Sequence, residues 1–197
     1  MSQAEHRREQ IFEAGARLFA ERGYGRTSLE EVAAELGVTR PALYYYYRSK
    51  EDLLYEITSF VMDRVMADLR EVTGRPCPPL EKLRDLVGRY VRFFASHPHE
   101  LTLMSTEVDS LGEERRRLIQ ERQREYLAGV REIVRALLAR HPGSPLDETA
   151  AAFWLLGGMN WIYTWYDPAG RITPDDLADH FIRLFCFGLQ GPPSSQE

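Results

Sequence analysis

The sequence contains only two cysteines, and it lacks both a secretion signal and a strongly apolar run of membrane length. Cys77 and Cys186 lie far apart and form no CxxC pair, so the pattern indicates neither a disulfide framework nor a zinc site. The N-terminus is charged and has no apolar core of the kind that signal peptides carry. We therefore expect a cytoplasmic protein that holds no structural metal.

One stretch without formal charge, residues 149–166, is the only candidate for a membrane segment. It is short for a bilayer span, and Gly157, Gly158 and Asn160 interrupt its apolar side chains. A buried helix is the favoured interpretation, and no membrane partner is expected.

The motifs of common enzymes are also missing. The sequence has no GxSxG, P-loop or dinucleotide-binding pattern. His97 and His99 lie near Glu100, but their spacing fits no zinc motif and Pro98 breaks the helix there. No catalytic residue, metal ligand or cofactor is predicted. A helical enzyme and a helical interaction module without DNA binding remain as alternatives.

The composition is that of an ordinary globular protein. Its 197 residues, 44% of them hydrophobic, suit one compact domain or two small ones that share a core. Only Lys50 and Lys82 are lysines, so 23 of the 25 cations are arginines. The net charge is −5, with +1 on residues 1–50 and −6 on the remainder. Contact with DNA must therefore come from the placement of cations rather than from bulk charge.

Almost every segment has the apolar spacing of an α-helix, and the sequence shows no strand pattern and no repeat. The predicted fold is all-α, with an N-terminal three-helix domain that contains a helix-turn-helix and a larger helical domain after it. About nine helices are predicted, over residues 4–22, 28–36, 39–47, 50–72, 80–96, 99–110, 113–140, 146–166 and 174–189.

Capping side chains mark where the short N-terminal helices begin. Thr27 and Ser28, each followed three residues later by a glutamate, form overlapping capping boxes for the second helix. Gly37 ends that helix, and Thr39 caps the third, which has a proline in its first turn. Two short helices joined by a glycine turn predict a helix-turn-helix over residues 27–50.

Helix geometry assigns the four consecutive tyrosines, residues 44–47, to different sides of the third helix. Leu43 and Tyr47 share a face that packs inward, and Tyr45 is on the opposite side. At least two of the tyrosines must face outward. An outward tyrosine surface beside Arg40 suits a DNA groove, where a ring contacts a thymine methyl or a sugar and a guanidinium contacts a guanine edge.

The candidate DNA-binding residues combine this outward face with nearby cations and with hydroxyls at helix N-termini, which bind phosphate readily. They are Arg26, Thr27, Ser28, Thr39, Arg40, Pro41, Ala42, Tyr44, Tyr45, Tyr46 and Lys50. Spacing alone leaves open a three-helix corner in which the tyrosines only cover neighbouring structure.

Residues 27–54 resemble, position by position, the N-terminal domain of TetR-family transcriptional regulators. The most specific segments are Gly37-Val38, Leu43-Tyr44-Tyr45 and Ser49-Lys50-Glu51. The resemblance implies that Lys50 meets a phosphate and that the operator is faced by Arg40, Pro41, Ala42, Tyr44, Tyr45 and Tyr46. Tyr47 departs from the family, where phenylalanine is usual, and the sequence identifies no partner for its hydroxyl.

The resemblance also implies that different segments of the chain have different functions. Residues 1–48 are expected to bind DNA, residues 49–190 to bind an effector and dimerise, and residues 191–197 to form a disordered tail. A two-fold symmetric operator needs two recognition helices about one DNA turn apart, so we expect a homodimer. Residues 146–189 are the predicted interface, as four packed helices in the family's manner.

The second half of the chain is rich in aromatic and methionine side chains, which suit an adaptable apolar pocket. Gly157 and Gly158 inside a helix indicate close approach of a partner helix or a ligand. Trp154 and Trp161, seven residues apart, are expected on one helix face. The candidate effector residues are Met62, Met66, Tyr90, Phe93, Phe94, Met104, Tyr126, Val130, Trp154, Gly158 and Trp161. Ordinary core packing is the alternative for each.

Residues 158–172 are similar to the penultimate helix of TetR-type repressors of fatty-acid, steroid and phenylacetate catabolism, several of which respond to acyl-CoA esters. This resemblance implies a repressor that a small apolar effector, such as an acyl-CoA, releases from a palindromic operator. The cations available for the CoA phosphates are Arg89, Arg92, Arg122 and Arg131. A multidrug-type sensor that represses an efflux gene is the alternative.

Overall fold

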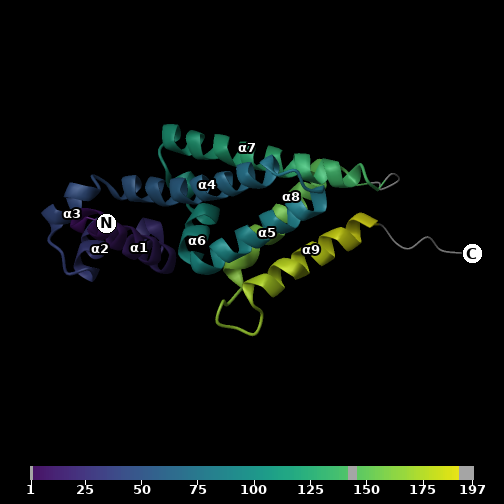
Figure 1. The fold of residues 1–197 in the computed structure, drawn as a ribbon. Helices are drawn as coiled ribbons and strands as arrows, with labels where there is room; N and C mark the ends of the chain where they lie inside the picture. The colour runs from purple at the N-terminus through teal and green to yellow at the C-terminus, as the bar shows by residue number, and fades with distance from the viewer. Residues whose placement is uncertain (1, 142–145, 191–197) are drawn as a thin grey trace, which may run out of the picture. The chain divides into compact units, whose positions relative to one another are not determined.

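The computed structural model describes residues 2–141 and 146–190, and all regular structure in this part is helical (Figure 1). The all-α prediction is confirmed, and the predicted tail, residues 191–197, lies outside the described residues. The described elements are α1 (Gln3–Arg22), η1 (Tyr24–Arg26), α2 (Leu29–Glu35), α3 (Arg40–Tyr46), α4 (Lys50–Gly74), α5 (Pro79–Ser96), α6 (Pro98–Thr106), η2 (Val108–Ser110), α7 (Glu113–Leu138), α8 (Glu148–Asn160), η3 (Trp161–Thr164) and α9 (Pro174–Gln190), where η marks a short 3-10 turn.

The helices form two compact units. Of the described residues, the first comprises 2–63 and 97–121, and the second comprises 64–96, 122–141 and 146–190. The long helices α4 and α7 therefore each contribute residues to both units. The predicted separation of residues 1–48 from 49–190 concerns function, and it stays a prediction.

Helix α2 of the first unit begins at one capping box rather than two. The Ser28 amide donates to Glu31 Oε2 at 2.7 Å, and the Glu31 amide donates to Ser28 Oγ at 3.3 Å. The overlapping box predicted for Thr27 is wrong, because the Thr27 hydroxyl instead donates to the Gly23 carbonyl at 3.0 Å. Thr27 is buried, and it therefore closes the turn before α2 rather than capping the helix.

Helices α1 and α4 approach closely within the first unit. A Cβ added at Gly15 of α1 would lie 2.4 Å from Leu53 Cδ2 of α4, so only glycine leaves room for this packing. Leu53 is fully buried, as are Leu18 and Phe19 on the same side of α1. Helix α4 starts where predicted, because the Asp52 amide donates to the capping Ser49 Oγ at 3.1 Å.

In the second unit α5 and α9 lie side by side (Figure 1). The predicted apolar face of α5 is confirmed, since Leu83, Leu86 and Tyr90 are all buried. Helix α9 begins at Thr173, whose hydroxyl accepts from the Asp176 amide at 3.1 Å. A Cβ added at Gly158 of α8 would lie 3.1 Å from the Phe181 ring of α9, so the close approach predicted there is made by a partner helix.

The helix predicted over residues 146–166 is shorter in the structure. Helix α8 ends at Asn160, and the 3-10 turn η3 follows. The Thr164 hydroxyl donates to the Trp161 carbonyl at 2.8 Å, which is the acceptor that a continuing α-helix would use. The prediction of one α-helix as far as residue 166 is wrong, although Trp161 still caps α8 in helical conformation, with its N–H donating to the Gly157 carbonyl. The predicted helix 99–110 is likewise divided into α6 and η2.

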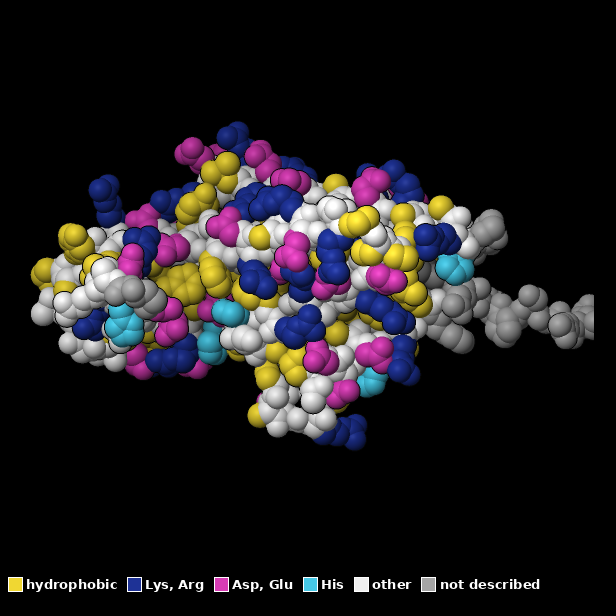
Figure 2. Space-filling model, in the orientation of Figure 1, with side chains coloured by type: hydrophobic (Ala, Val, Ile, Leu, Met, Phe, Trp, Pro, Cys, Tyr) yellow, Lys and Arg dark blue, Asp and Glu magenta, His cyan; other side chains and the backbone are white. Residues whose placement is uncertain are grey.

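No helix in the described ranges combines the length and apolarity that a membrane crossing requires. Lys and Arg side chains are intermixed with Asp and Glu side chains over the face shown in Figure 2, rather than gathered in one basic area. This mixture agrees with the expectation that any DNA contact depends on the placement of individual cations.

Candidate DNA-binding surface and effector region

A helix-turn-helix is present in the first unit. Helix α2 leads into a turn at Gly37, whose φ of 63° lies in the left-handed region that glycine adopts without strain. Thr39 then caps α3 by accepting from the Ala42 amide at 3.4 Å. Leu43 and Tyr47 are buried as predicted, and they fix which face of α3 points outward.

The outward face of α3 is aromatic and cationic. Tyr45 is 82% exposed, which is the highest exposure of any large hydrophobic side chain in the described residues. The Tyr46 ring stands edge-on against it, with ring centroids 5.2 Å apart. The other predicted DNA-facing residues with exposed side chains are Arg26, Thr39, Arg40, Pro41 and Ala42; Ser28, Tyr44 and Tyr46 are half-buried.

Thr27 and Lys50 are placed differently from the other candidates. The Thr27 side chain is only 2% exposed, so the structure does not present its hydroxyl at the surface. Lys50 Nζ donates to the carbonyls of Tyr24 at 2.8 Å and Thr27 at 3.2 Å, and it lies 4.3 Å from the centroid of the Tyr24 ring. Lys50 therefore ties the start of α4 to η1, and its ammonium group is already engaged by protein.

The hydroxyl of Tyr47 has a hydrogen-bond partner that could not be identified from the sequence. It donates to Glu56 Oε1 of α4 at 3.0 Å, and Arg8 Nε of α1 donates to the same oxygen at 3.1 Å. The Arg8 guanidinium also lies 5.2 Å from the centroid of the Tyr47 ring. Burial, with a contribution from Glu56, raises the pKa of Tyr47 above its usual value. The end of α3 is thus joined to both α1 and α4.

Glu30 of α2 is a second residue that sequence reasoning treated only as a capping partner. Its Oε1 accepts from Tyr44 Oη at 3.0 Å and lies 2.9 Å from Arg40 Nη2. The Arg40 guanidinium lies 5.3 Å from the centroid of the Tyr44 ring. One carboxylate oxygen thus contacts two of the predicted operator-facing side chains.

The candidate effector residues fall into two groups. A buried group lies in the second unit and comprises Met66, Tyr90, Phe93, Phe94, Tyr126 and Val130. Met62, which is buried, and Met104, which is half-buried, belong to the first unit. Trp154, Gly158 and Trp161 are exposed, so these three do not line an interior pocket within the second unit.

The apolar core of the second unit contains buried tyrosine hydroxyls. Tyr90 Oη donates to Asn160 Oδ1 at the end of α8. Burial raises the pKa of Tyr90 well above its usual value and also raises that of Tyr126. Both side chains are therefore neutral hydrogen-bonding groups in apolar surroundings, which is an arrangement found in binding sites for small ligands.

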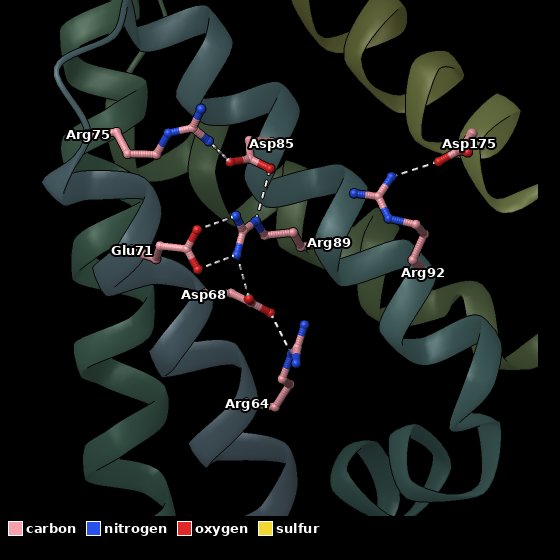
Figure 3. A network of polar contacts seen from close by, with 8 residues as sticks. All are labelled: Arg64, Asp68, Glu71, Arg75, Asp85, Arg89, Arg92 and Asp175. Carbon is pink, nitrogen blue, oxygen red and sulfur yellow. Dashed lines mark hydrogen bonds and ion pairs between the residues drawn. The ribbon is translucent and has the colours of Figure 1, made fainter.

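The arginines considered for CoA phosphates are engaged to different degrees. Arg89 donates to Asp68 at 3.1 Å, to Asp85 at 2.9 Å and to Glu71 at 2.7 Å, so three carboxylates surround its guanidinium (Figure 3). Hydrogen bonds, first to Glu71, raise the pKa of Arg89. It is therefore not open to a phosphate in this structure.

The other arginines of that set also have partners. Arg92 donates to Asp175 at 2.7 Å, although both side chains are exposed (Figure 3). Arg131 lies 3.9 Å from Glu148, and its Nε is buried without a hydrogen-bond partner. Arg122 is half-buried. Of the four arginines, Arg89 is the least available to contact a CoA phosphate.

An anchored helix-turn-helix with an outward aromatic and cationic face defines a DNA-binding protein. The second all-helical unit is an additional domain of this protein. Comparison with known proteins identifies the family. The family of bacterial regulatory proteins named for tetR matches residues 11–57, and the tetracyclin repressor-like C-terminal domain matches residues 76–189. The chain belongs to the TetR family of transcriptional regulators.

Individual relatives agree with this assignment. The transcriptional repressor KstR2 of Rhodococcus jostii is 27% identical over 189 residues, which cover 94% of this chain and 92% of the relative. A TetR-family regulator from Bordetella parapertussis is 30% identical, with a TM-score of 0.84 over 95% of this chain and 98% of that one. AibR, solved with isovaleryl coenzyme A and operator DNA, is 31% identical, with a TM-score of 0.78 over 90% and 97% of the two chains.

The family and these relatives establish that the chain is a DNA-binding transcriptional regulator rather than an enzyme. They also agree with the fold prediction, in which a helix-turn-helix domain precedes a larger helical domain.

Proposed function

We propose that the chain is a repressor that binds a palindromic operator as a homodimer in the cytoplasm and is released by a small apolar effector. The observation that carries the DNA-binding part is the geometry of α3. Buried Leu43 and Tyr47 hold the helix in place, while exposed Tyr45 and Arg40 face outward. This is the arrangement in which a recognition helix enters a major groove.

Dimerisation is supported by the distribution of exposed apolar side chains. Nine large hydrophobic side chains are exposed in the described residues, and six of them lie between residues 146 and 184. We call these six the C-terminal apolar surface: Leu146, Phe153, Trp154, Trp161, Trp165 and Leu184. Such a concentration on and beside α8, η3 and α9 is typical of an interface, and a second copy of this chain is the partner that a two-fold operator requires.

For the effector we propose an acyl-CoA, with a multidrug-type ligand as the alternative. Likeness to AibR, whose structure contains isovaleryl coenzyme A, supports the first. The buried aromatic and methionine side chains of the second unit supply apolar surroundings for an acyl chain. Release would follow if the effector favoured a conformation in which α4 shifts and the two recognition helices no longer match the groove spacing.

The role of α3 is tested by Tyr45→Ala. We expect it to weaken binding to the preferred operator by about 1–3 kcal/mol, which is the range for loss of a good base contact. The fold should be unchanged, because this side chain is 82% exposed. Fluorescence anisotropy with a duplex selected from a randomised library measures the effect. Tyr45→Phe, which removes only the hydroxyl, separates the ring's contribution from the hydroxyl's; unaltered affinity in both variants would contradict the assignment of α3.

The effector is tested by titrating a panel of acyl-CoA esters into a preformed protein–operator complex. Medium-chain, long-chain or aromatic esters are expected to release the DNA, and free coenzyme A is the control for phosphate contacts alone. Binding should change tryptophan fluorescence. Release by cationic drugs but by no ester would instead support the multidrug-type sensor.

A further inference from the structure

The carboxylate of Glu30 sits at the edge of the surface through which the protein is proposed to read DNA. A single oxygen of this side chain contacts both Tyr44 Oη and Arg40 Nη2. Helix α2 therefore fixes two side chains of α3 through one acceptor. Hydrogen bonds, first from its own backbone N–H and then from Tyr44, keep the pKa of Glu30 below its usual value. The group is ionised at neutral pH.

The ion pair with Arg40 adds little stability beyond what Glu30 contributes as an acidic residue in the first turn of α2. The Arg40 and Glu30 side chains are 68% and 42% exposed, and exposed ion pairs contribute little to folding. A negative charge beside a DNA-facing surface also repels phosphates, so it lowers affinity for every sequence. The contacts with Arg40 and Tyr44 offer a benefit of a different kind, which is how these two side chains are presented.

Orientation of Arg40 is the benefit that the geometry provides. An unpaired exposed arginine samples many rotamers and binds any phosphate within reach as a mobile charge. Here Glu30 holds the guanidinium, which also lies over the Tyr44 ring at 5.3 Å from its centroid. The paired cation is less available to phosphates, and its restricted orientation favours the bidentate contact with a base edge that gives discrimination.

We propose that Glu30 is a specificity-determining positioning residue of operator binding: it acts through Arg40 and Tyr44 to lower affinity for arbitrary DNA and to raise the ratio of specific to non-specific binding. This inference rests on the proposed role of α3 as the recognition helix. It assigns to α2 a part in sequence discrimination in addition to its structural role in the helix-turn-helix.

The test is Glu30→Gln, which removes the charge, leaves an acceptor for Tyr44 and preserves the side chain's shape. Binding is measured to a duplex selected by the unaltered protein and to a scrambled duplex of equal composition, each at several salt concentrations. We expect tighter binding to the scrambled duplex, with a salt dependence steeper by about one phosphate contact. The ratio of specific to non-specific affinity should fall by about tenfold.

Glu35→Gln is the matched control. Glu35 lies on the same helix and is also ion-paired, but its partner is Arg17 of α1, at 2.6 Å, rather than a residue of α3. Its replacement removes the same charge and should leave the affinity ratio unchanged. An equal fall in both variants would show a general charge effect and overturn the proposal.

A double variant tests whether Glu30 acts through Arg40. In an Arg40→Ala background, Glu30→Gln should change the affinity ratio much less than in the unaltered protein. Base preferences in a repeated selection should relax only at the positions that Arg40 and Tyr44 contact. If the Glu30→Gln variant keeps the same ratio of specific to non-specific affinity, the role proposed for Glu30 is contradicted. The assignment of α3 as the recognition helix is then unaffected. If the unaltered protein selects no duplex, the proposed function itself fails, and this inference fails with it.

Discussion

Asp68→Ala is expected to lower the free energy of unfolding by about 2–4 kcal/mol, because it removes one partner from a buried ion pair. Asp68 is only 6% exposed, and it accepts from Arg64 at 2.9 Å and from Arg89 at 3.1 Å (Figure 3). Loss of the carboxylate leaves the partly buried Arg89 with less compensation. The expected cost is below that of an isolated buried pair, since Glu71 and Asp85 still contact Arg89. Urea unfolding at fixed protein concentration measures the change in the free energy of unfolding.

Glu71→Ala is the matched control for this prediction. Glu71 accepts hydrogen bonds from the same guanidinium as Asp68, that of Arg89, but the Glu71 side chain is 58% exposed. Solvent screens an exposed pair, so its removal should cost no more than about 1 kcal/mol. Equal losses in the two variants would show that burial does not determine the contribution of this network. Asp68→Asn, which keeps an acceptor, should fall between them.

Charge introduced into the C-terminal apolar surface is expected to separate the proposed dimer. Phe153 and Leu184 are 58% and 67% exposed in the single chain. The double variant Phe153→Glu, Leu184→Glu should raise the dimer dissociation constant by about 100-fold or more, because interface anchors each contribute about 2 kcal/mol and the introduced charges would be desolvated in an apolar interface. Sedimentation velocity over a range of concentrations measures this change.

Leu118→Glu provides the control for that experiment. Leu118 is also an exposed leucine, but it lies on α7 and is not part of the C-terminal apolar surface. Its replacement should leave the assembly state unchanged. A chain that is monomeric at tens of micromolar and still binds a palindromic duplex specifically would contradict the proposed dimer.

The sequence alone predicted the elements of the helix-turn-helix because the interactions that define them are local. The Ser28 capping box, the Gly37 turn and the Thr39 cap each involve residues within about four positions of one another. The inward placement of Leu43 and Tyr47 follows from helical periodicity in the same way. Tertiary structure was needed only to confirm them.

Tertiary structure alone decided which partners the polar side chains take. Tyr47 bonds to Glu56, Lys50 to backbone carbonyls in and just after η1, and Arg89 to carboxylates of α4. Each pairing joins helices or turns whose contact depends on how the chain packs. No periodicity or capping signal encodes such contacts, so these partners of Lys50 and Arg89 could not be predicted, and both cations were expected to contact phosphates.

The end of α8 and the surroundings of Trp154 were decided in the same way. A stretch without charge predicted one long buried helix, but the helix ends at Asn160 and Trp154 is exposed. Its ring instead stacks at 6.0 Å from that of Phe185 on α9. Apolar composition shows that a side chain needs apolar surroundings. Whether a core, a ligand or a second chain supplies them depends on which face packing leaves uncovered.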